Sequence, residues 1–299
     1  MEKFINEKVV VYISKFTNTK VIEALKDGMM FSLPFLMIGS LFLLIANLPI
    51  KSLNTLVAEC GLADICSQVY SSTFSLMALF TVVGITYSYL KNDKISTAVN
   101  GALTGLAAFV LLTPSSKVLE NGEAVTGVIS KDWTAGQGMI CAILIGFLVG
   151  YIYSLCIRKD IRVKMPEGVP PGVADSFSSL LPTGIITIVC AIIYAVCHFV
   201  FKTTFAELIY SAIQIPLQGV TDSFAGVVIM TVMMSLLWWT GVRGGSICGG
   251  ILSPILQANM AANQKILDSG VALLFRMVVI SLLNSSGITF YACLVLSLD

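Results

Sequence analysis

Long apolar blocks separated by short polar segments run along the whole chain. Seven blocks contain no Asp, Glu, Lys or Arg, and they cover 28–50, 69–90, 95–113, 133–157, 181–201, 223–242 and 277–298. A helix needs about 20 mostly apolar residues to cross the hydrocarbon core of a bilayer, and each block is close to that length. The pattern therefore predicts about seven transmembrane helices.

Two further segments have patterns of their own. Segment 203–217 is too short to span, and its apolar residues have the spacing of an amphipathic helix that lies in the membrane interface: Phe205, Leu208, Ile209, Ala212, Ile213 and Leu217. Segment 244–264 is free of charge but contains Gly244, Gly245, Gly249, Gly250, Pro254, Asn259, Asn263 and Gln264. Glycines, a proline and amides at membrane depth are typical of a re-entrant or broken segment that lines a cavity.

Composition agrees with a membrane protein. Of the 299 residues, 56% are apolar and only 12% are charged, which is too little charge to cover the surface of a soluble globule of 32.1 kDa. The net charge of +1 and the lack of a basic run argue against nucleic acid as a partner. The single histidine, His198, cannot build a histidine-rich metal site, and we place it at the membrane interface. We therefore predict an all-α integral membrane protein.

The distribution of lysine and arginine orients the chain. The N-terminal segment and the loops that follow the second and fourth blocks hold eleven of these cations, whereas the alternate loops hold four. Because cytoplasmic loops carry the excess of Lys and Arg, the sequence predicts a cytoplasmic N-terminus.

Small residues and cysteines leave alternatives open. The pairs Gly101/Gly105 and Gly146/Gly150 are candidates for close helix packing, either within one subunit or at a dimer interface. Cys60 and Cys66 share one loop, where they are either reduced or joined in a disulfide.

Several motifs resemble one membrane protein family. The loop Met165-Pro-Glu-Gly-Val-Pro-Pro171, followed by Ser176-Phe177 and Leu181-Pro182, resembles the membrane-embedded IIC components of phosphoenolpyruvate-dependent sugar phosphotransferase systems, of the lactose/cellobiose/diacetylchitobiose group. The resemblance extends to Ala24–Ser40, Trp238–Ser246, Ala258–Asn263 and Asn284–Gly287, in the family's order.

The resemblance implies an organisation and partners. Residues 1–202 would form an interface domain of five spans that makes a homodimer, 203–221 an amphipathic connector, and 222–299 part of a transport domain that holds one disaccharide. The expected protein is a multi-pass component of the cytoplasmic membrane. The resemblance implies a permease and not an enzyme, with no cofactor or metal. A separate phosphorylated IIB protein would transfer the phosphoryl group to the sugar.

Seven residues match the family's sugar-binding region: Arg243, Gly245, Ser246, Asn259, Asn263, Asn284 and Ser285. Arg243 stands where the family usually has a histidine. It either contacts a sugar hydroxyl or phosphate, or reaches water and headgroups as a snorkelling cation, or marks a degenerating site. Asn259 and Asn263 share a helix face and bind either sugar or another helix.

Relative to the family, the chain stops before a second re-entrant hairpin and an Asn-Glu-Pro motif. It is therefore expected to be C-terminally truncated. The alternative function is a transport-inactive relative that acts only as a membrane dimer or remnant.

Overall fold

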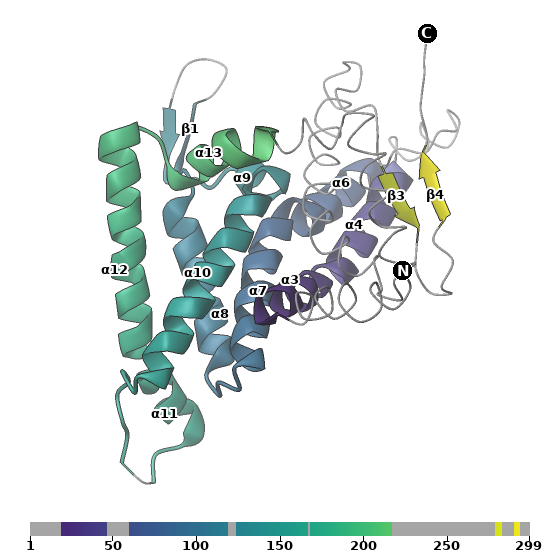
Figure 1. The fold of residues 1–299 in the computed structure, drawn as a ribbon. Helices are drawn as coiled ribbons and strands as arrows, with labels where there is room; N and C mark the ends of the chain where they lie inside the picture. Colours follow the sequence, from purple (N-terminus) through teal and green to yellow (C-terminus); the bar gives the residue numbers. More distant parts are fainter. Residues whose placement is uncertain are drawn as a thin grey trace, which may run out of the picture.

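The computed structural model describes residues 19–46, 60–118, 124–166 and 168–216, together with 279–282 and 290–293. Most of these residues are helical, and the elements form a bundle of long, roughly parallel helices with a second arm that diverges from it (Figure 1). We keep the element labels of Figure 1 below.

Three helical runs in this part of the chain are long and apolar enough to cross a membrane. The first, Leu62–Asn92, contains α6 (Leu62–Thr73) and α7 (Met77–Asn92), joined by one 3₁₀ turn. The second, Gly136–Arg158, is mainly α10 (Met139–Arg158). The third, Pro171–Phe201, joins α11 (Pro171–Ser178), α12 (Leu180–Val196) and a π-helical turn (Cys197–Phe201).

The third predicted block forms a shorter apolar helix, α8 (Ala98–Leu112). The described residues thus place helices at the second to fifth blocks, while block 223–242 lies outside them.

The prediction of one continuous helix over 28–50 is wrong. The chain forms α3 (Lys20–Met30) and α4 (Leu33–Ala46) with a break at Phe31 and Ser32. Pro34 explains the break, because a proline ring clashes with the carbonyl four residues earlier, here that of Met30, whereas proline is tolerated in the first turn of a new helix. In Figure 1, α3 lies beside α7 and α4 lies beside α6.

Helix α7 occupies the centre of the bundle. It packs against α3, α8 and α10, and α12 covers α8 and α10 from the outside (Figure 1). The buried side chains between these helices include Val82, Leu90, Phe109, Ile145 and Tyr153. Burial of this kind stabilises the bundle in the membrane through packing contacts, since lipid tails are as apolar as the core itself.

The four glycines of the predicted packing pairs all face neighbouring helices of the same chain. A Cβ on Gly105 would lie 2.6 Å from Oγ1 of Thr86, and one on Gly146 would lie 3.1 Å from the Ile85 side chain. Gly101 faces Leu90 and Gly150 faces Tyr89 in the same way. The interpretation as packing within one subunit is therefore confirmed, because α7 already fills the space beside each glycine.

The amphipathic segment is helical, as predicted. It begins with α13 (Phe205–Ile209) and continues into a π-helical turn (Tyr210–Gln214). Glu207 stabilises its start by accepting hydrogen bonds from N and Oγ1 of Thr204, both at 2.9 Å. Helix α13 runs across the ends of α10 and α12 instead of alongside them (Figure 1).

Short strands in the described residues depart from the all-α prediction. β1 (Ser116–Val118) pairs antiparallel with β2 (Ala124–Thr126) outside the bundle. β3 (Val279–Leu282) pairs antiparallel with β4 (Phe290–Cys293), inside the block predicted as the last helix. Residue types explain this difference. β-Branched and aromatic residues favour strands, and the Asn284-Ser-Ser-Gly287 run between them is rich in turn formers.

Candidate functional site

The seven sequence-predicted sugar residues lie outside the described residues: Arg243, Gly245, Ser246, Asn259, Asn263, Asn284 and Ser285. Their geometry therefore stays a prediction. Three polar arrangements stand out in the described part of the chain.

The first arrangement fixes the proline-rich loop to the bundle. The loop ends at Pro170, and Pro171 takes the first position of α11, where its fixed φ suits a helix start. Asn100 on α8 donates from Nδ2 to the carbonyl oxygen of Asp175 at 3.2 Å and to Oγ of Ser179 at 3.0 Å. Because Asp175 and Ser179 lie at the end of α11, these bonds hold the loop's exit against α8.

Threonine hydroxyls extend the same contact along α12. Oγ1 of Thr104 and Oγ1 of Thr183 are 2.9 Å apart. Thr104 is buried and also donates to the carbonyl of Asn100. Hydrogen bonds between helices in a membrane contribute about 0.6 kcal/mol each on average, so Asn100 and Thr104 together form a modest polar clamp between α8 and α11–α12.

A groove of about 320 Å³ lies along this clamp. Its walls are Asn100, Leu103, Thr104, Ala107, Ser176, Ser179 and Thr183. Amide and hydroxyl groups beside apolar side chains can bind a neutral molecule or another helix. The lining of the groove is therefore suited to binding.

The second arrangement is an ionic cluster at the end of α7. Lys20 Nζ lies 2.5 Å and Arg158 Nη2 lies 2.6 Å from Oδ1 of Asp93, and Ser154 donates to Oδ2 at 2.5 Å. Burial by itself would raise the pKa of the Asp93 carboxyl. The hydrogen bonds from Lys20 and Ser154, with the charges of Lys20 and Arg158, outweigh it and hold that pKa below its ordinary value. Asp93 thus stays ionised and joins α3, α7 and α10.

The third arrangement attaches the connector to the bundle. Gln214 is buried and donates from Nε2 to the carbonyl oxygen of Gly136 at 2.8 Å, while its Oε1 has no hydrogen-bond partner among the described residues. Nearby, the rings of Trp133 and Tyr210 meet edge to face with centroids 5.8 Å apart. These contacts hold the described part of the connector against the bundle.

The structure decides the cysteine alternative and shows the contacts of the single histidine. Cys60 is exposed, Cys66 is buried, and both are free thiols, so the disulfide alternative is wrong. His198 stacks on Tyr194 with ring centroids 5.9 Å apart, near the exposed Phe199 at the end of α12. Among the residues that the structure describes, no three His, Cys, Asp or Glu side chains gather in a way that could hold a metal ion.

Sequence reasoning did not single out Asp93, Asn100 or Thr104. A signal was present for two of them, because Asp93 is an acid between two apolar blocks and Asn100 is an amide inside one. Lys20 lies 73 residues from Asp93 along the chain, and the partners of Asn100 and Thr104 on α11 and α12 lie 75 to 79 residues away. Sequence spacing does not reveal contacts between residues so far apart.

Comparison with known proteins decides the family. The family model described as "Phosphotransferase system, EIIC" matches residues 26–294. The chain belongs to this EIIC family. EIIC components are transport permeases of the cytoplasmic membrane, in agreement with the apolar helices described above.

Individual relatives give more detail. The oligo-beta-mannoside-specific EIIC component of Bacillus subtilis is 32% identical over 269 residues, which cover 89% of this chain and 60% of that protein. The cellobiose-specific EIIC component of Geobacillus stearothermophilus is 30% identical over 278 residues, covering 89% and 61%. The crystal structure of ChbC, the IIC component of the N,N'-diacetylchitobiose system, superposes with a TM-score of 0.85 at 30% identity, over 91% of this chain and 65% of ChbC. The chain thus spans less than two thirds of the length of each.

Proposed function

We propose that this EIIC chain carries the sugar pathway of a permease for a β-linked disaccharide, such as cellobiose or chitobiose. The superposition on ChbC over 91% of the chain is the observation that carries the proposal. The relatives named for oligo-β-mannosides and cellobiose support the same substrate class, because all three names refer to short β-linked sugars. In this proposal the sugar is delivered to the cytoplasm, where a phosphorylated IIB protein phosphorylates it.

The proposed domain boundaries are consistent with the polar arrangements described above. Residues 1–202 form the interface domain of a homodimer, residues 203–221 form the connector, and residues 222–299 belong to the transport domain. The hydrogen bond between Gln214 and Gly136 supports this boundary, because it fixes the connector to the bundle just before the transport residues begin. The N-terminus is proposed to lie in the cytoplasm, as the lysine and arginine distribution indicates.

The proposed sugar site consists of Arg243, Gly245, Ser246, Asn259, Asn263, Asn284 and Ser285. Hydroxyl-rich ligands are recognised by amides, hydroxyls and backbone groups, and this set supplies all three. Arg243 adds a permanent cation with several donors, which suits a sugar hydroxyl or the incoming phosphoryl group.

Sugar uptake and sugar binding test the proposal separately. Cells that lack other β-disaccharide permeases and express this chain should accumulate labelled cellobiose or chitobiose, and accumulation should need phosphoenolpyruvate and the general phosphotransferase proteins. Purified chain should show a higher melting temperature with the disaccharide than with an α-linked control such as maltose. A dimer with neither uptake nor a disaccharide-dependent shift would contradict transport and favour the alternative of a membrane dimer without permease activity.

A further inference from the structure

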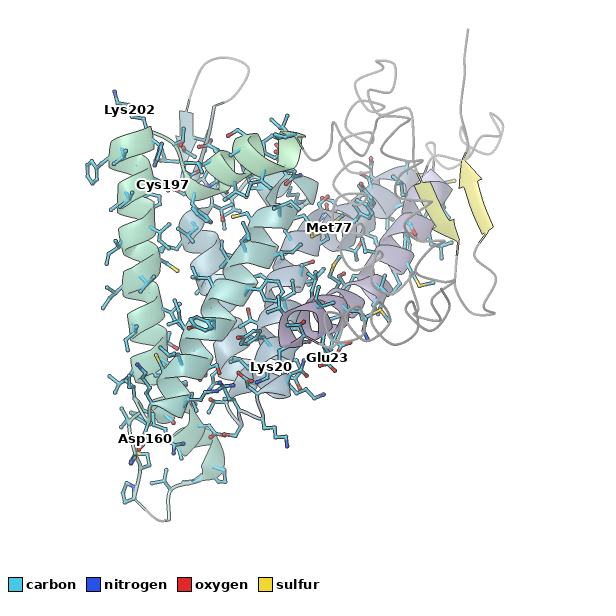
Figure 2. All side chains as sticks on the ribbon, in the orientation of Figure 1. Lys20, Glu23, Met77, Asp160, Cys197 and Lys202 are labelled. Carbon is cyan, nitrogen blue, oxygen red and sulfur yellow. The ribbon has the colours of Figure 1, made fainter. Side chains whose placement is uncertain are left out.

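Two exposed cations share one buried carboxylate oxygen at the end of α7. Lys20 Nζ and Arg158 Nη2 both contact Oδ1 of Asp93, whose side chain is 1% exposed, whereas those of Lys20 and Arg158 are 57% and 59% exposed. Asp93 therefore holds the two cationic groups next to each other but is itself covered. Figure 2 shows Lys20 at the same end of the bundle as Asp160, opposite Lys202.

The position of this cluster along the bundle matches the edge of the hydrocarbon layer. The apolar run Leu62–Asn92 ends one residue before Asp93, and the run Gly136–Arg158 ends at Arg158 itself. Because both runs end at this level, the cationic groups lie where lipid headgroups begin.

The cluster keeps hydrogen-bonding capacity that Asp93 does not use. A lysine ammonium has three donors and an arginine guanidinium has five, and one carboxylate engages only part of them. Two cations against one carboxylate also leave a net positive charge. Adjacent ammonium and guanidinium groups of this kind match the geometry of a phosphate group.

An apolar track leads from the cations toward the middle of the membrane. Tyr151, Leu155 and Arg158 follow one another at spacings of four and three residues, so they lie on one face of α10. Tyr151 and Leu155 are both exposed. The cation at the end of this face and the apolar residues behind it match the two parts of a phospholipid.

We propose that Lys20 and Arg158 bind the headgroup phosphate of one anionic phospholipid, whose acyl chain lies along Tyr151 and Leu155. The apolar track favours a lipid over free phosphate, which would gain nothing from it. The lipid would link α3 to α10 at the surface, as Asp93 does beneath it. This site is separate from the sugar residues and does not depend on the proposed transport function.

Lipid retention by the purified 299-residue chain tests the site. The chain is titrated in detergent with phosphatidylglycerol or phosphatidylcholine, and bound lipid is counted by native mass spectrometry. We expect preferential binding of phosphatidylglycerol. One cation near an anionic lipid surface contributes roughly fivefold in affinity, so Lys20→Gln should weaken phosphatidylglycerol binding by about that factor, and Lys20→Arg should preserve it.

The chain offers a matched control for charge. Arg162 and Lys164 also share a carboxylate, that of Asp160, but Asp160 is exposed and lies beyond the end of α10. Arg162→Gln removes the same charge as Lys20→Gln, and we expect it to leave phosphatidylglycerol retention unchanged. An equal loss in both variants, or equal retention of the two lipids, would overturn the proposal in favour of unspecific surface charge.

A second variant separates lipid from soluble phosphate and does not touch the ionic cluster. Tyr151→Ser removes an exposed apolar side chain from the proposed acyl track, and it should weaken phosphatidylglycerol binding. If instead Tyr151→Ser binds phosphatidylglycerol as the parent does, and millimolar inorganic phosphate displaces the lipid, the ligand is a soluble phosphate and the lipid assignment is wrong.

Discussion

Gly28 and Gly84 meet backbone to backbone where α3 crosses α7. A Cβ added at Gly28 would lie 2.5 Å from the Cα and N of Ile85, and one added at Gly84 would overlap the carbonyl oxygen of Gly28. Because neither glycine carries a side chain, the backbones of α3 and α7 come into direct contact at this point. This approach brings Lys20, eight residues before Gly28, to Asp93 at the end of α7.

Gly84→Ala is expected to destabilise the bundle. The methyl group would force α3 away from α7, and overpacking of this kind costs about 1–3 kcal/mol, partly offset by the better helix propensity of alanine. The midpoint of thermal unfolding in detergent, followed by size-exclusion chromatography, measures the effect. Gly184→Ala on α12 is the matched control, because nothing lies within 4 Å of its added Cβ. A lower midpoint in the control than in Gly84→Ala would contradict the contact.

Asp93→Asn is expected to lower stability at neutral pH by about 1–2 kcal/mol, a modest value because Lys20 and Arg158 are exposed to solvent screening. The pKa of Asp93 is lowered in the folded chain from an ordinary value of 3.8. Its stabilisation is therefore fully present above pH 3.8 and is lost as the pH falls through the lower folded value. Melting midpoints of parent and variant between pH 7 and pH 3 should converge only at the acid end. A difference that is the same at every pH would contradict the ionic role.

Thr104 and Thr183 should be coupled in a double-mutant cycle. Thr104→Val and Thr183→Val each break the hydrogen bond between α8 and α12. The loss in free energy of unfolding should therefore be smaller in the double variant than the sum of the losses in the two single variants, by about 0.6 kcal/mol. Unfolding midpoints of the four proteins give the coupling. Thr187→Val is the control, because in the part of the chain that the structure describes the Thr187 hydroxyl donates within its own helix, to the carbonyl of Thr183. Additive losses for the Thr104 and Thr183 pair would argue against the clamp.

The proposed orientation makes a prediction about Cys60. With a cytoplasmic N-terminus, the loop that holds this exposed thiol faces the outside of the cell, whereas Cys66 is buried. A membrane-impermeant maleimide added to intact cells should therefore label the chain, and Cys60→Ser should lose that label. Labelling that needs broken cells would reverse the orientation.

Arg243→Gln should weaken disaccharide binding if Arg243 contacts the sugar. Hydrogen bonds to charged groups contribute about 1.5–3 kcal/mol, so the dissociation constant should rise by roughly tenfold to a hundredfold. Isothermal calorimetry with cellobiose measures it. Lys202→Gln, which removes the same charge just before the connector in the sequence, is the control and should bind as the parent does. Unchanged binding in Arg243→Gln would indicate that Arg243 is a snorkelling cation.

The pattern of apolar and polar residues along the sequence predicted most of the helices in the described residues. The blocks at 69–90, 95–113, 133–157 and 181–201 all contain helices, because a long run without charge leaves the backbone no stable alternative in lipid. The pattern failed at Phe31 and Ser32, where Pro34 divides one apolar block into two helices. Hydropathy counts apolar residues and is insensitive to the backbone geometry that one proline imposes.

The polar features of the candidate site were likewise predicted only in part. The family that the motifs resemble is confirmed, whereas the sugar residues from Arg243 to Ser285 that the resemblance implies stay a prediction. The ionic cluster at Asp93 and the clamp at Asn100 were not predicted, since each joins residues far apart in the sequence. Glycine spacing left two interpretations of Gly101/Gly105 open, and only the position of α7 beside them decided between them.

The sequence by itself determined that this protein belongs in a membrane, that the blocks from 69 to 201 contain helices, and which family the chain resembles. These properties depend on local composition and on short motifs, because the solvation of each apolar block is decided residue by residue. The tertiary structure alone decided that Gly28 and Gly84 touch and that Lys20 and Arg158 share the carboxylate of Asp93. Contacts of this kind depend on how helices cross, and a crossing is fixed by the packing of whole helix surfaces.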